Sequence, residues 1–384
     1  MFKHKKTVAP SLGLMHFALL LAGLGTALLG PILPVLATQW AMKDSQSGLL
    51  MTAKFCGAFL GGVSVSKNLR RSILTGMLAG TLGFGGFALA PGMIWGGIAL
   101  FVAGYGIGLL ITATNILAGR RFTLHRGSAL SLLNFSFSLG AMLSALLSAW
   151  LLPYFSLRSL MEWFAGAFLL GGIGLLIEMR GAPAEEFEPV PVEGKASEGF
   201  DNRIYLYFAG LLFLYGGLET CLSGWLTTFA LRYGDKTLVI SEYTTLLLWM
   251  SLTVGRAAAS AVMLRVGEKT VQRWGLVLAA VFTAALAVGH SAITIAVFTV
   301  LLGLSLAPFF PSTWALLMAK KPAARQAGII LAVSGLGAAS LPWLMGVIST
   351  RTGSLQVALG VPLGAALILL GMSLFSPTAK LAAE

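Results

Sequence analysis

The chain has 384 residues, of which 57% are hydrophobic and only 10% are charged. Soluble globular proteins carry about a quarter charged residues, so this composition excludes a soluble protein and predicts an exterior that faces lipid. A formal net charge of +12 is also found in nucleic-acid-binding proteins, but the placement of the basic residues explains it without nucleic acid as a partner.

Twelve apolar runs follow one another along the chain, each close to the length of about 20 residues that crosses a bilayer as a helix. The first run is too long to be the apolar core of a cleaved signal peptide, so we expect it to be retained. The sequence therefore predicts an all-α membrane protein with twelve transmembrane helices. The predicted spans are residues 11–37, 45–66, 72–91, 93–118, 129–152, 157–178, 204–231, 243–264, 272–290, 293–318, 327–350 and 355–376.

Lysine and arginine are unevenly distributed between the alternate connections of these spans. With both termini placed in the cytoplasm, 19 of the 26 basic residues fall on the cytoplasmic side and 5 on the other side. Cytoplasmic segments carry such an excess, so we expect a multi-pass protein of the cell membrane, as in the inner membrane of a bacterium, with both termini cytoplasmic. The remaining two basic residues, Lys54 and Arg256, fall within spans.

Residues 180–203 differ in kind from the rest of the chain, because they are acidic and contain three prolines. Such a segment neither embeds in lipid nor packs into a core. We therefore expect a cytoplasmic linker that joins an N-terminal six-helix bundle, residues 1–179, to a C-terminal six-helix bundle, residues 204–384.

The two halves of the chain repeat each other. Gly57 aligns with Gly255 at an offset of 198 residues, and Gly104 aligns with Gly303 at an offset of 199. Parallel repeats of this kind place a transporter's binding site at the interface between the halves, near the bilayer midplane. The repeat therefore predicts two pseudo-symmetric bundles that rock against each other.

One loop carries a family motif. Residues 62–71 are similar to the sequence Gly-x-x-x-Asp-Arg-x-Gly-Arg-Arg, with Ser66 in place of the aspartate and both final arginines retained. This motif is typical of the major facilitator superfamily, which the chain resembles over nearly its whole length. The resemblance implies the major facilitator fold and transport by alternating access.

Within that superfamily the chain most resembles the fucose-type sugar:cation symporters. This resemblance implies a monosaccharide as the transported solute. The acidic positions of those carriers in the first and fourth spans correspond here to Pro31 and Ile111, so their scheme of ion coupling cannot be carried over. The similar patches are residues 25–31, 115, 129–135, 215–219, 224–226 and 307–311.

Glu219 is the only acidic residue deep within a predicted span. Carboxylates in the membrane interior are costly and usually functional, so we expect Glu219 to carry a proton or to accept a hydrogen bond from a sugar hydroxyl. The alternative is a structural carboxylate that pairs with a neighbouring helix. Lys54 is the second candidate for proton coupling; pairing with Glu219, binding of an anionic substrate and snorkelling towards the interface are its open alternatives.

Neutral polar and aromatic side chains within the spans complete the predicted substrate site. Amides and hydroxyls hydrogen-bond to sugar hydroxyls, and tryptophan rings offer a stacking face to a pyranose. Interhelical hydrogen bonds and interfacial aromatic belts are the competing roles. Together with Glu219, the predicted substrate-binding residues are Asn115, Asn134, Thr220, Trp225, Trp249, Ser312 and Trp314.

Four basic residues are predicted to form a cytoplasmic gate. Lys67 and Arg71 belong to the loop motif, and Arg265 belongs to its copy in the second half. Arg256 lies within a span and is assigned to the same network. The predicted gate residues are Lys67, Arg71, Arg256 and Arg265.

No enzyme signature is present in the sequence. The four histidines are scattered, both cysteines lie in apolar runs, and no phosphate-binding loop occurs, so we expect no metal, no cofactor and no ATP-driven step. The predicted function is secondary active transport of a small neutral solute, a monosaccharide, by a monomer in the lipid bilayer. Protons would couple through Glu219, or sodium would replace them; passive sugar uniport and efflux of amphiphilic drugs or lipids are the alternatives.

Overall fold

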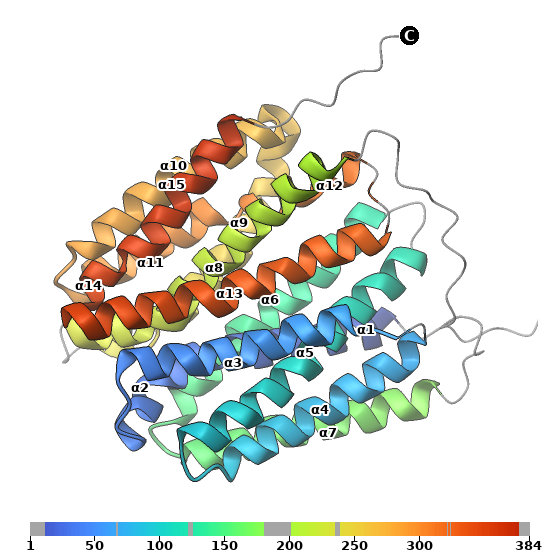
Figure 1. The fold of residues 1–384 in the computed structure, drawn as a ribbon, viewed down its shortest axis with the longest axis horizontal. Helices are drawn as coiled ribbons and strands as arrows, with labels where there is room; N and C mark the ends of the chain where they lie inside the picture. The colour runs from blue at the N-terminus through green and yellow to red at the C-terminus, as the bar shows by residue number, and fades with distance from the viewer. Residues whose placement is uncertain are drawn as a thin grey trace, which may run out of the picture.

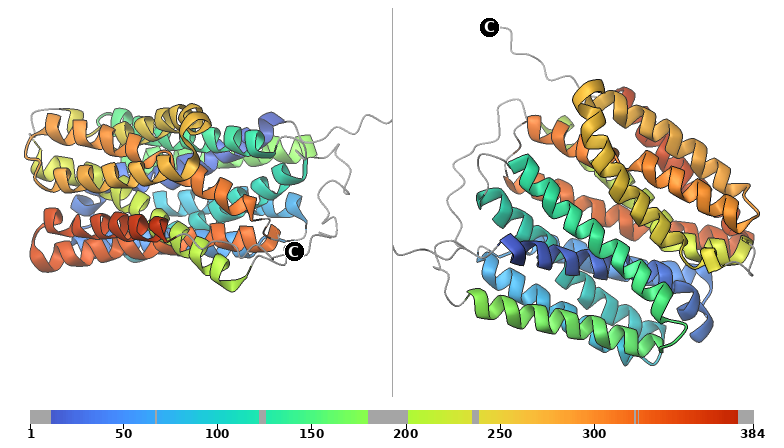
Figure 2. Two further views of the ribbon diagram at one scale, coloured as in Figure 1. Left: turned by 90° about the horizontal axis from the view of Figure 1, so that it is seen from above. Right: turned by 180° about the vertical axis from the view of Figure 1, so that it is seen from behind.

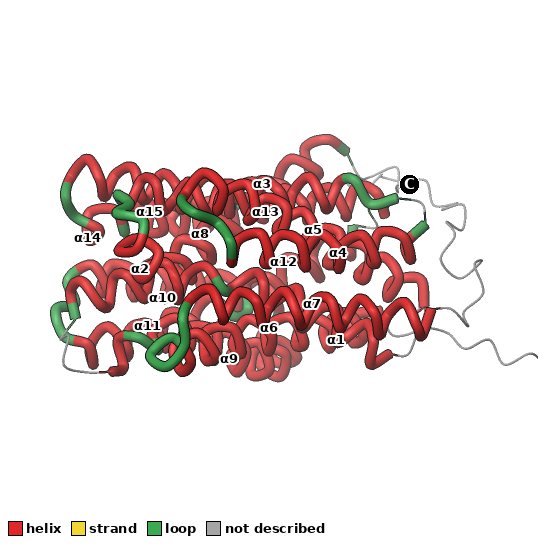
Figure 3. Tube along the Cα trace, turned by 90° about the horizontal axis from the view of Figure 1, so that it is seen from below, coloured by secondary structure: helices red, strands yellow, loops and turns green. Residues whose placement is uncertain are grey.

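The computed structural model describes residues 12–66, 68–121, 126–179, 201–234, 239–320, 322 and 324–375. These residues contain α-helices, one short 3₁₀ helix and no strand. The helices lie side by side with their long axes roughly parallel, and short loops join them at the two ends (Figures 1 and 3). The predicted all-α fold is confirmed.

The N-terminal half contains six spans, the first of which is broken into two helices. Its helices are α1 (Leu12–Ala27), α2 (Leu29–Gln39), α3 (Asp44–Val63), α4 (Leu69–Ala88), α5 (Met93–Arg121), α6 (Arg126–Leu151) and α7 (Leu157–Met179).

The C-terminal half repeats this arrangement, with breaks in its fourth and sixth spans. Its helices are α8 (Asn202–Tyr233), α9 (Thr244–Val266), α10 (Glu268–Ala287), α11 (Ala292–Leu306), α12 (Phe309–Ala319), α13 (Ala324–Thr352), α14 (Leu355–Ala358) and α15 (Gly360–Leu374), with a 3₁₀ turn at Val239–Ser241 before α9. Residues 180–200 of the predicted linker lie outside the described residues. Asp201 caps α8, because its carboxylate accepts hydrogen bonds from the Arg203 and Ile204 amides at 3.0 and 2.9 Å.

Nine helical stretches in the described part of the chain are long and apolar enough to cross a membrane on their own. The three predicted spans outside this group are α3, α4 and α9. Two of these, α3 and α9, are equivalent helices of the repeat, and each carries one cation at mid-length, Lys54 and Arg256. Both helices take part in contacts between the halves, α3 with α13 and α9 with α6.

The break in the first span follows from proline. Pro31 has no N–H to donate to the Ala27 carbonyl and Pro34 has none for the Gly30 carbonyl, and the helix is interrupted at Leu28. The short helix α2 then lies against α8. A Cβ on Gly30 would lie only 2.0 Å from the Ser223 carbonyl oxygen, so glycine is what allows this backbone contact.

In the described part of the chain, the main contacts between the two halves are those of α3 with α13, α2 with α8, and α6 with α9. Seen from behind, α6 lies between α1 of its own half and α9 of the other (Figure 2). We call the end of the bundle at which α1 begins and α15 ends the terminal end, and the opposite end the far end.

Candidate functional site

A polar cluster lies in the middle of the bundle, where the halves meet. The Arg256 guanidinium pairs with Glu219, with Nη2 and Oε1 3.0 Å apart. The hydroxyl of Tyr215 donates to the same carboxylate oxygen at 3.1 Å. Nη1 of Arg256 donates to Ser138 Oγ, so this central cluster (Ser138, Tyr215, Glu219 and Arg256) connects α8 and α9 of one half with α6 of the other.

The local structure of α8 positions the acidic part of the central cluster. Tyr215 and Glu219 are four residues apart and share one face of the helix. The glycines between them let α13 approach, since a Cβ on Gly217 would lie 2.9 Å from the Gly337 carbonyl oxygen. Because α8 is fixed against α13 by backbone contact, the Glu219 carboxylate has a fixed position towards α9.

The Glu219–Arg256 pair is largely shielded, with each side chain 20% exposed. Pairing lowers the free-energy cost of both charges, since a charge within the bilayer is tolerated chiefly when it has a partner. The sequence prediction assigned Arg256 to a gate with Arg71 and Arg265, but the structure puts it beside Glu219 halfway along α9. The sequence contained the signal, because Arg256 and Glu219 are two of the three charges deep within spans.

Aromatic side chains adjoin the central cluster. Tyr215 stacks on Phe309, with ring centroids 4.8 Å apart and an interplanar angle of 17°. Phe310 lies 6.2 Å from Tyr215 and, in turn, 6.2 Å from Trp314, to which it is nearly parallel. Of the predicted tryptophans, Trp314 belongs to this aromatic series. Tyr215 and Phe310 were not among the predicted site residues.

Lys54 does not pair with Glu219 in this structure. It is 3% exposed, and its Nζ donates to the backbone carbonyl of Thr26, next to the break between α1 and α2. The ammonium also lies 4.8 Å from the centre of the Phe55 ring. Of the alternatives for Lys54, snorkelling towards an interface is excluded by this burial.

The neutral residues of the predicted substrate site are mostly engaged in packing. Asn115 Nδ2 donates to the Ile111 carbonyl of its own helix at 2.8 Å. Ser312 is fully buried and donates to the Pro308 carbonyl, and Trp225 donates from Nε1 to the Pro342 carbonyl at 3.1 Å. Thr220 and Trp249 are buried as well, whereas Asn134 is half-buried on α6, one turn from Ser138.

Two predicted gate residues lie at the terminal end. Arg71, in the first turn of α4, and Arg265, in the last turn of α9, are exposed. Neither takes part in an ion pair with another described residue. Lys67 lies outside the described residues, so the predicted gate stays a prediction.

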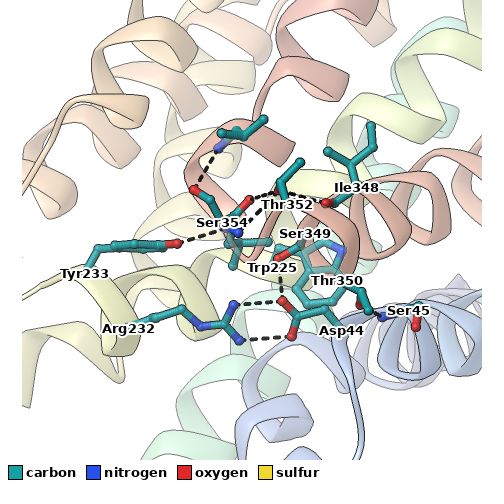
Figure 4. Close-up of polar contacts among 12 residues, drawn as sticks. Asp44, Ser45, Trp225, Arg232, Tyr233, Ile348, Ser349, Thr350, Thr352 and Ser354 are labelled. Carbon is teal, nitrogen blue, oxygen red and sulfur yellow. Dashed lines mark hydrogen bonds and ion pairs between the residues drawn. The ribbon is translucent and has the colours of Figure 1, made fainter.

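The far end carries a second polar cluster that joins the halves. Arg232 of α8 makes a bidentate pair with Asp44 of α3, at 2.7 and 2.9 Å. Ser349 of α13 donates to the same carboxylate, and the Ser45 amide donates to Thr350 Oγ1 at 2.8 Å. Figure 4 shows Arg232 and Ser349 converging on Asp44, beside the contact of Ser45 with Thr350. We call the group of Asp44, Ser45, Arg232, Ser349 and Thr350 the far-end lock.

Burial alone would raise the pKa of the Asp44 carboxyl. The hydrogen bonds from Arg232 and Ser349 and the charge of Arg232 outweigh that effect, and the pKa lies below its usual value. Asp44 therefore stays ionised through the neutral range. This pair was not predictable from the sequence, because residues 188 positions apart give no local pattern.

The described hydrogen bonds between the halves share one feature: they lie at the far end, along α3 and α13, or at the central cluster. Thr52 Oγ1, for example, donates to the Ala339 carbonyl at 2.7 Å. Within the described residues, the halves are therefore joined by hydrogen bonds from the far end down to mid-length.

Comparison with known proteins decides the family. Residues 15–330 match the sequence profile described as "Major Facilitator Superfamily". The chain belongs to the major facilitator superfamily. Two relatives of this major facilitator are transporters of Acinetobacter baylyi. It is 28% identical to the niacin transporter NiaP over 176 residues, which are 42% of this chain and 38% of the relative.

It is also 31% identical to the 4-hydroxybenzoate transporter PcaK over 165 residues, which are 41% of this chain and 34% of that protein. The matches thus span little more than a third of the length of either curated relative. They do not bear out the narrower resemblance to fucose-type symporters.

Solved structures of major facilitators have the same fold. The chain superposes on the partially occluded, inward-open xylose transporter XylE of E. coli with a TM-score of 0.77 and 13% identity, over 97% of this chain and 100% of that one. For FucP in its outward conformation, the TM-score is 0.66 at 16% identity, over 96% and 98% of the two chains. At such identities the likeness concerns the fold alone.

The fold gives the two polar clusters of this major facilitator different positions. The central cluster lies near mid-length at the interface of the six-helix halves, where transporters with such repeats bind their substrates. The far-end lock lies at one exit of that interface. The protein is thus an integral multi-pass membrane protein of this superfamily, and its in-span ion pair lies near mid-length where the two halves meet.

Proposed function

We propose that this major facilitator is a proton-linked secondary transporter of a small aromatic carboxylate. The observation that carries the proposal is the Glu219–Arg256 ion pair in the central cluster, 3.0 Å long and linked through Ser138 to the other half. We place the terminal end in the cytoplasm, on the basis of the lysine and arginine distribution, and expect a monomer.

The chemistry of Arg256 favours an anionic substrate. A guanidinium has five N–H donors; here one nitrogen donates to Glu219 and another to Ser138, while Nε is buried without a hydrogen-bond partner. Planar guanidinium groups match the two oxygens of a carboxylate in bidentate pairs. A substrate carboxylate would compete with Glu219 for Arg256 and use donors that the present arrangement leaves free.

The surroundings of Arg256 favour an aromatic body on that anion. Tyr215, Phe310 and Trp314 form an aromatic series that begins at the central cluster, and offset stacking on such rings contributes about 0.5–1.5 kcal/mol beyond burial. The relatives named above are transporters of niacin and 4-hydroxybenzoate, and both compounds are aromatic carboxylic acids. The names of these relatives and the aromatic series beside Arg256 are two separate lines of support for an aromatic carboxylate.

Competition for one guanidinium also supplies a coupling scheme. While Glu219 is ionised it occupies Arg256; once Glu219 is protonated, Arg256 is released to the substrate carboxylate. One proton and one anion then cross together, and the net charge moved is zero. Transport of this kind responds to the pH gradient and not to the membrane potential, which acts only on net charge.

A neutral monosaccharide, the solute implied by the fucose-type resemblance, is the second candidate. Asn134 favours it, because this half-buried amide lies four residues before Ser138 on the same face of α6. Its amide would hydrogen-bond sugar hydroxyls next to the central cluster.

Ligand-dependent melting of the purified protein separates these candidates. Stabilisation by a ligand grows with its concentration above the dissociation constant, so we would compare benzoate, its neutral isostere benzamide, and a panel of monosaccharides. We expect benzoate to raise the melting temperature of the wild type more than benzamide does at the same concentration, and monosaccharides to leave it unchanged. The shift should disappear in Arg256→Gln and persist in Lys269→Gln, a control at an exposed cation in the first turn of α10.

Equal shifts with benzamide, or a retained benzoate shift in Arg256→Gln, would contradict the carboxylate assignment. A shift with a monosaccharide alone would support the second candidate.

A further inference from the structure

Lys54 is a buried cation that the coupling scheme above does not use. An ammonium has three donors, but the described contacts of Lys54 are one hydrogen bond to the Thr26 carbonyl and the face of the Phe55 ring. No described carboxylate pairs with it. A cation in mid-membrane is costly when it lacks a counter-charge, so its presence calls for an explanation.

The register of the helices puts Lys54 level with Glu219. Gly30 of α2 touches Ser223 of α8, and the chain runs from the terminal end to the far end in both spans. One turn back, about 6 Å, leads from Gly30 to Thr26 and from Ser223 to Glu219. The Thr26 carbonyl, which accepts from Lys54, therefore lies at the same depth as the Glu219 carboxylate, on the opposite side of the interface between the halves.

A second contact leads to the same conclusion. A Cβ on Gly224 of α8 would lie 2.6 Å from Cε of Met51 on α3, so these two residues meet at the interface between the halves. Lys54 follows Met51 by three residues and shares its face of α3. The packing between the halves is weaker towards the terminal end, because α8 packs on α2 but not to a comparable extent on α1 in the described residues.

We propose that Lys54 is the contact of the N-terminal half for the transported carboxylate, opposite Arg256 of the C-terminal half. The inference rests on the proposed function and deepens it. When Glu219 takes up a proton, both cations lack a carboxylate partner, and the two oxygens of one substrate carboxylate satisfy both. The anion then ties the two halves together at the level of the central cluster.

The test is the charge preference of binding to the full-length purified protein. For each protein, the dissociation constants of benzoate and benzamide are measured on the same purified sample. The proteins compared are the wild type, Lys54→Met, Lys54→Gln and Lys54→Arg. Lys269→Met, at an exposed lysine of α10, is the matched control. The ratio of the two constants is independent of any loss of folded protein, because both ligands meet the same sample.

We expect Lys54→Met and Lys54→Gln to weaken benzoate binding at least tenfold and to leave benzamide binding unchanged, so that the preference for the anion falls by that factor. Lys54→Arg and Lys269→Met should retain the wild-type preference. A preference that survives in Lys54→Met and Lys54→Gln, together with a lower melting temperature, would overturn the inference: Lys54 would then only brace the break between α1 and α2.

A failure of the proposed function would look different. In that case the wild type itself would bind benzamide as tightly as benzoate, and Arg256→Gln would change nothing. That outcome would overturn both proposals, whereas an unchanged preference in the Lys54 variants alone overturns only this one.

Discussion

The far-end lock makes a quantitative prediction about the balance between conformations. Asp44→Asn and Arg232→Gln each remove one partner of the bidentate pair, whose side chains are 13% and 39% exposed. Fully exposed pairs contribute about 0.2–1 kcal/mol, and hydrogen bonds to charged groups about 1.5–3 kcal/mol. For this half-shielded pair we expect a coupling energy of about 1.5 kcal/mol, which is roughly a tenfold shift towards the state in which the far end is open.

The assay measures the distance between the halves at the far end. Spin labels at Tyr154 and Val288, which are 76% and 70% exposed, would report it in a background without Cys56 and Cys221. Each single variant should populate a longer distance, and the double variant should add little to either one, as a double-mutant cycle of two interacting residues requires. Full additivity, or an unchanged distance distribution in the single variants, would refute the lock.

The same lock has a defined pH dependence. The pKa of Asp44 is lowered in the folded protein, so its contribution is complete above the ordinary aspartate pKa of about 3.9 and is lost only as the pH falls below that value. The distance distribution should therefore be constant from neutral pH down to about pH 4. A lock that opens between pH 5 and 7 would show that another group controls it.

Three further predictions concern packing, specificity and charge. Gly30→Ala should lower the melting temperature, because its Cβ would meet the Ser223 carbonyl oxygen at 2.0 Å and overpacking costs about 1–3 kcal/mol; Gly174→Ala, where nothing lies within 4 Å, should not. Phe310→Ala should weaken benzoate binding by about 0.5–1.5 kcal/mol and spare acetate binding, and an equal loss for both acids would argue against stacking. In proteoliposomes, a potential imposed with valinomycin should leave benzoate uptake unchanged while an inward proton gradient drives it; a potential-driven flux would contradict the one-to-one scheme.

Much of the fold was predictable from the sequence, since lipid leaves the backbone few choices. Polar backbone groups in a bilayer must be satisfied within helices, so each run of about 20 apolar residues had one structural solution. The breaks at Pro31 and Pro308 shift the ends of elements without changing the number of spans. The cations Lys54 and Arg256 did not prevent the prediction of α3 and α9, because the runs of residues around them are apolar.

The partners within the site were less predictable, because they depend on which helices meet at which depth. Glu219 and Arg256 both stood out as charges deep within spans, yet no pattern in the sequence showed that α9 would bring Arg256, and not Lys54, to Glu219. Trp225 and Trp249 were predicted to bind substrate, but both are buried among helices. The sequence around a tryptophan in an apolar span does not show whether its ring faces a ligand or packs against other helices. Burial of one face or another is set by interhelical register, which a single sequence does not give.

The most direct test of the central claim is proton-driven uptake of benzoate by Glu219→Gln in proteoliposomes, measured beside benzoate counterflow in the same vesicles. Glutamine has nearly the shape of protonated glutamate and cannot release a proton, so Arg256 stays available to the substrate. We expect counterflow to continue and accumulation driven by an inward proton gradient to be lost. Full proton-driven accumulation in Glu219→Gln would contradict the account, because the proton would then have to bind elsewhere.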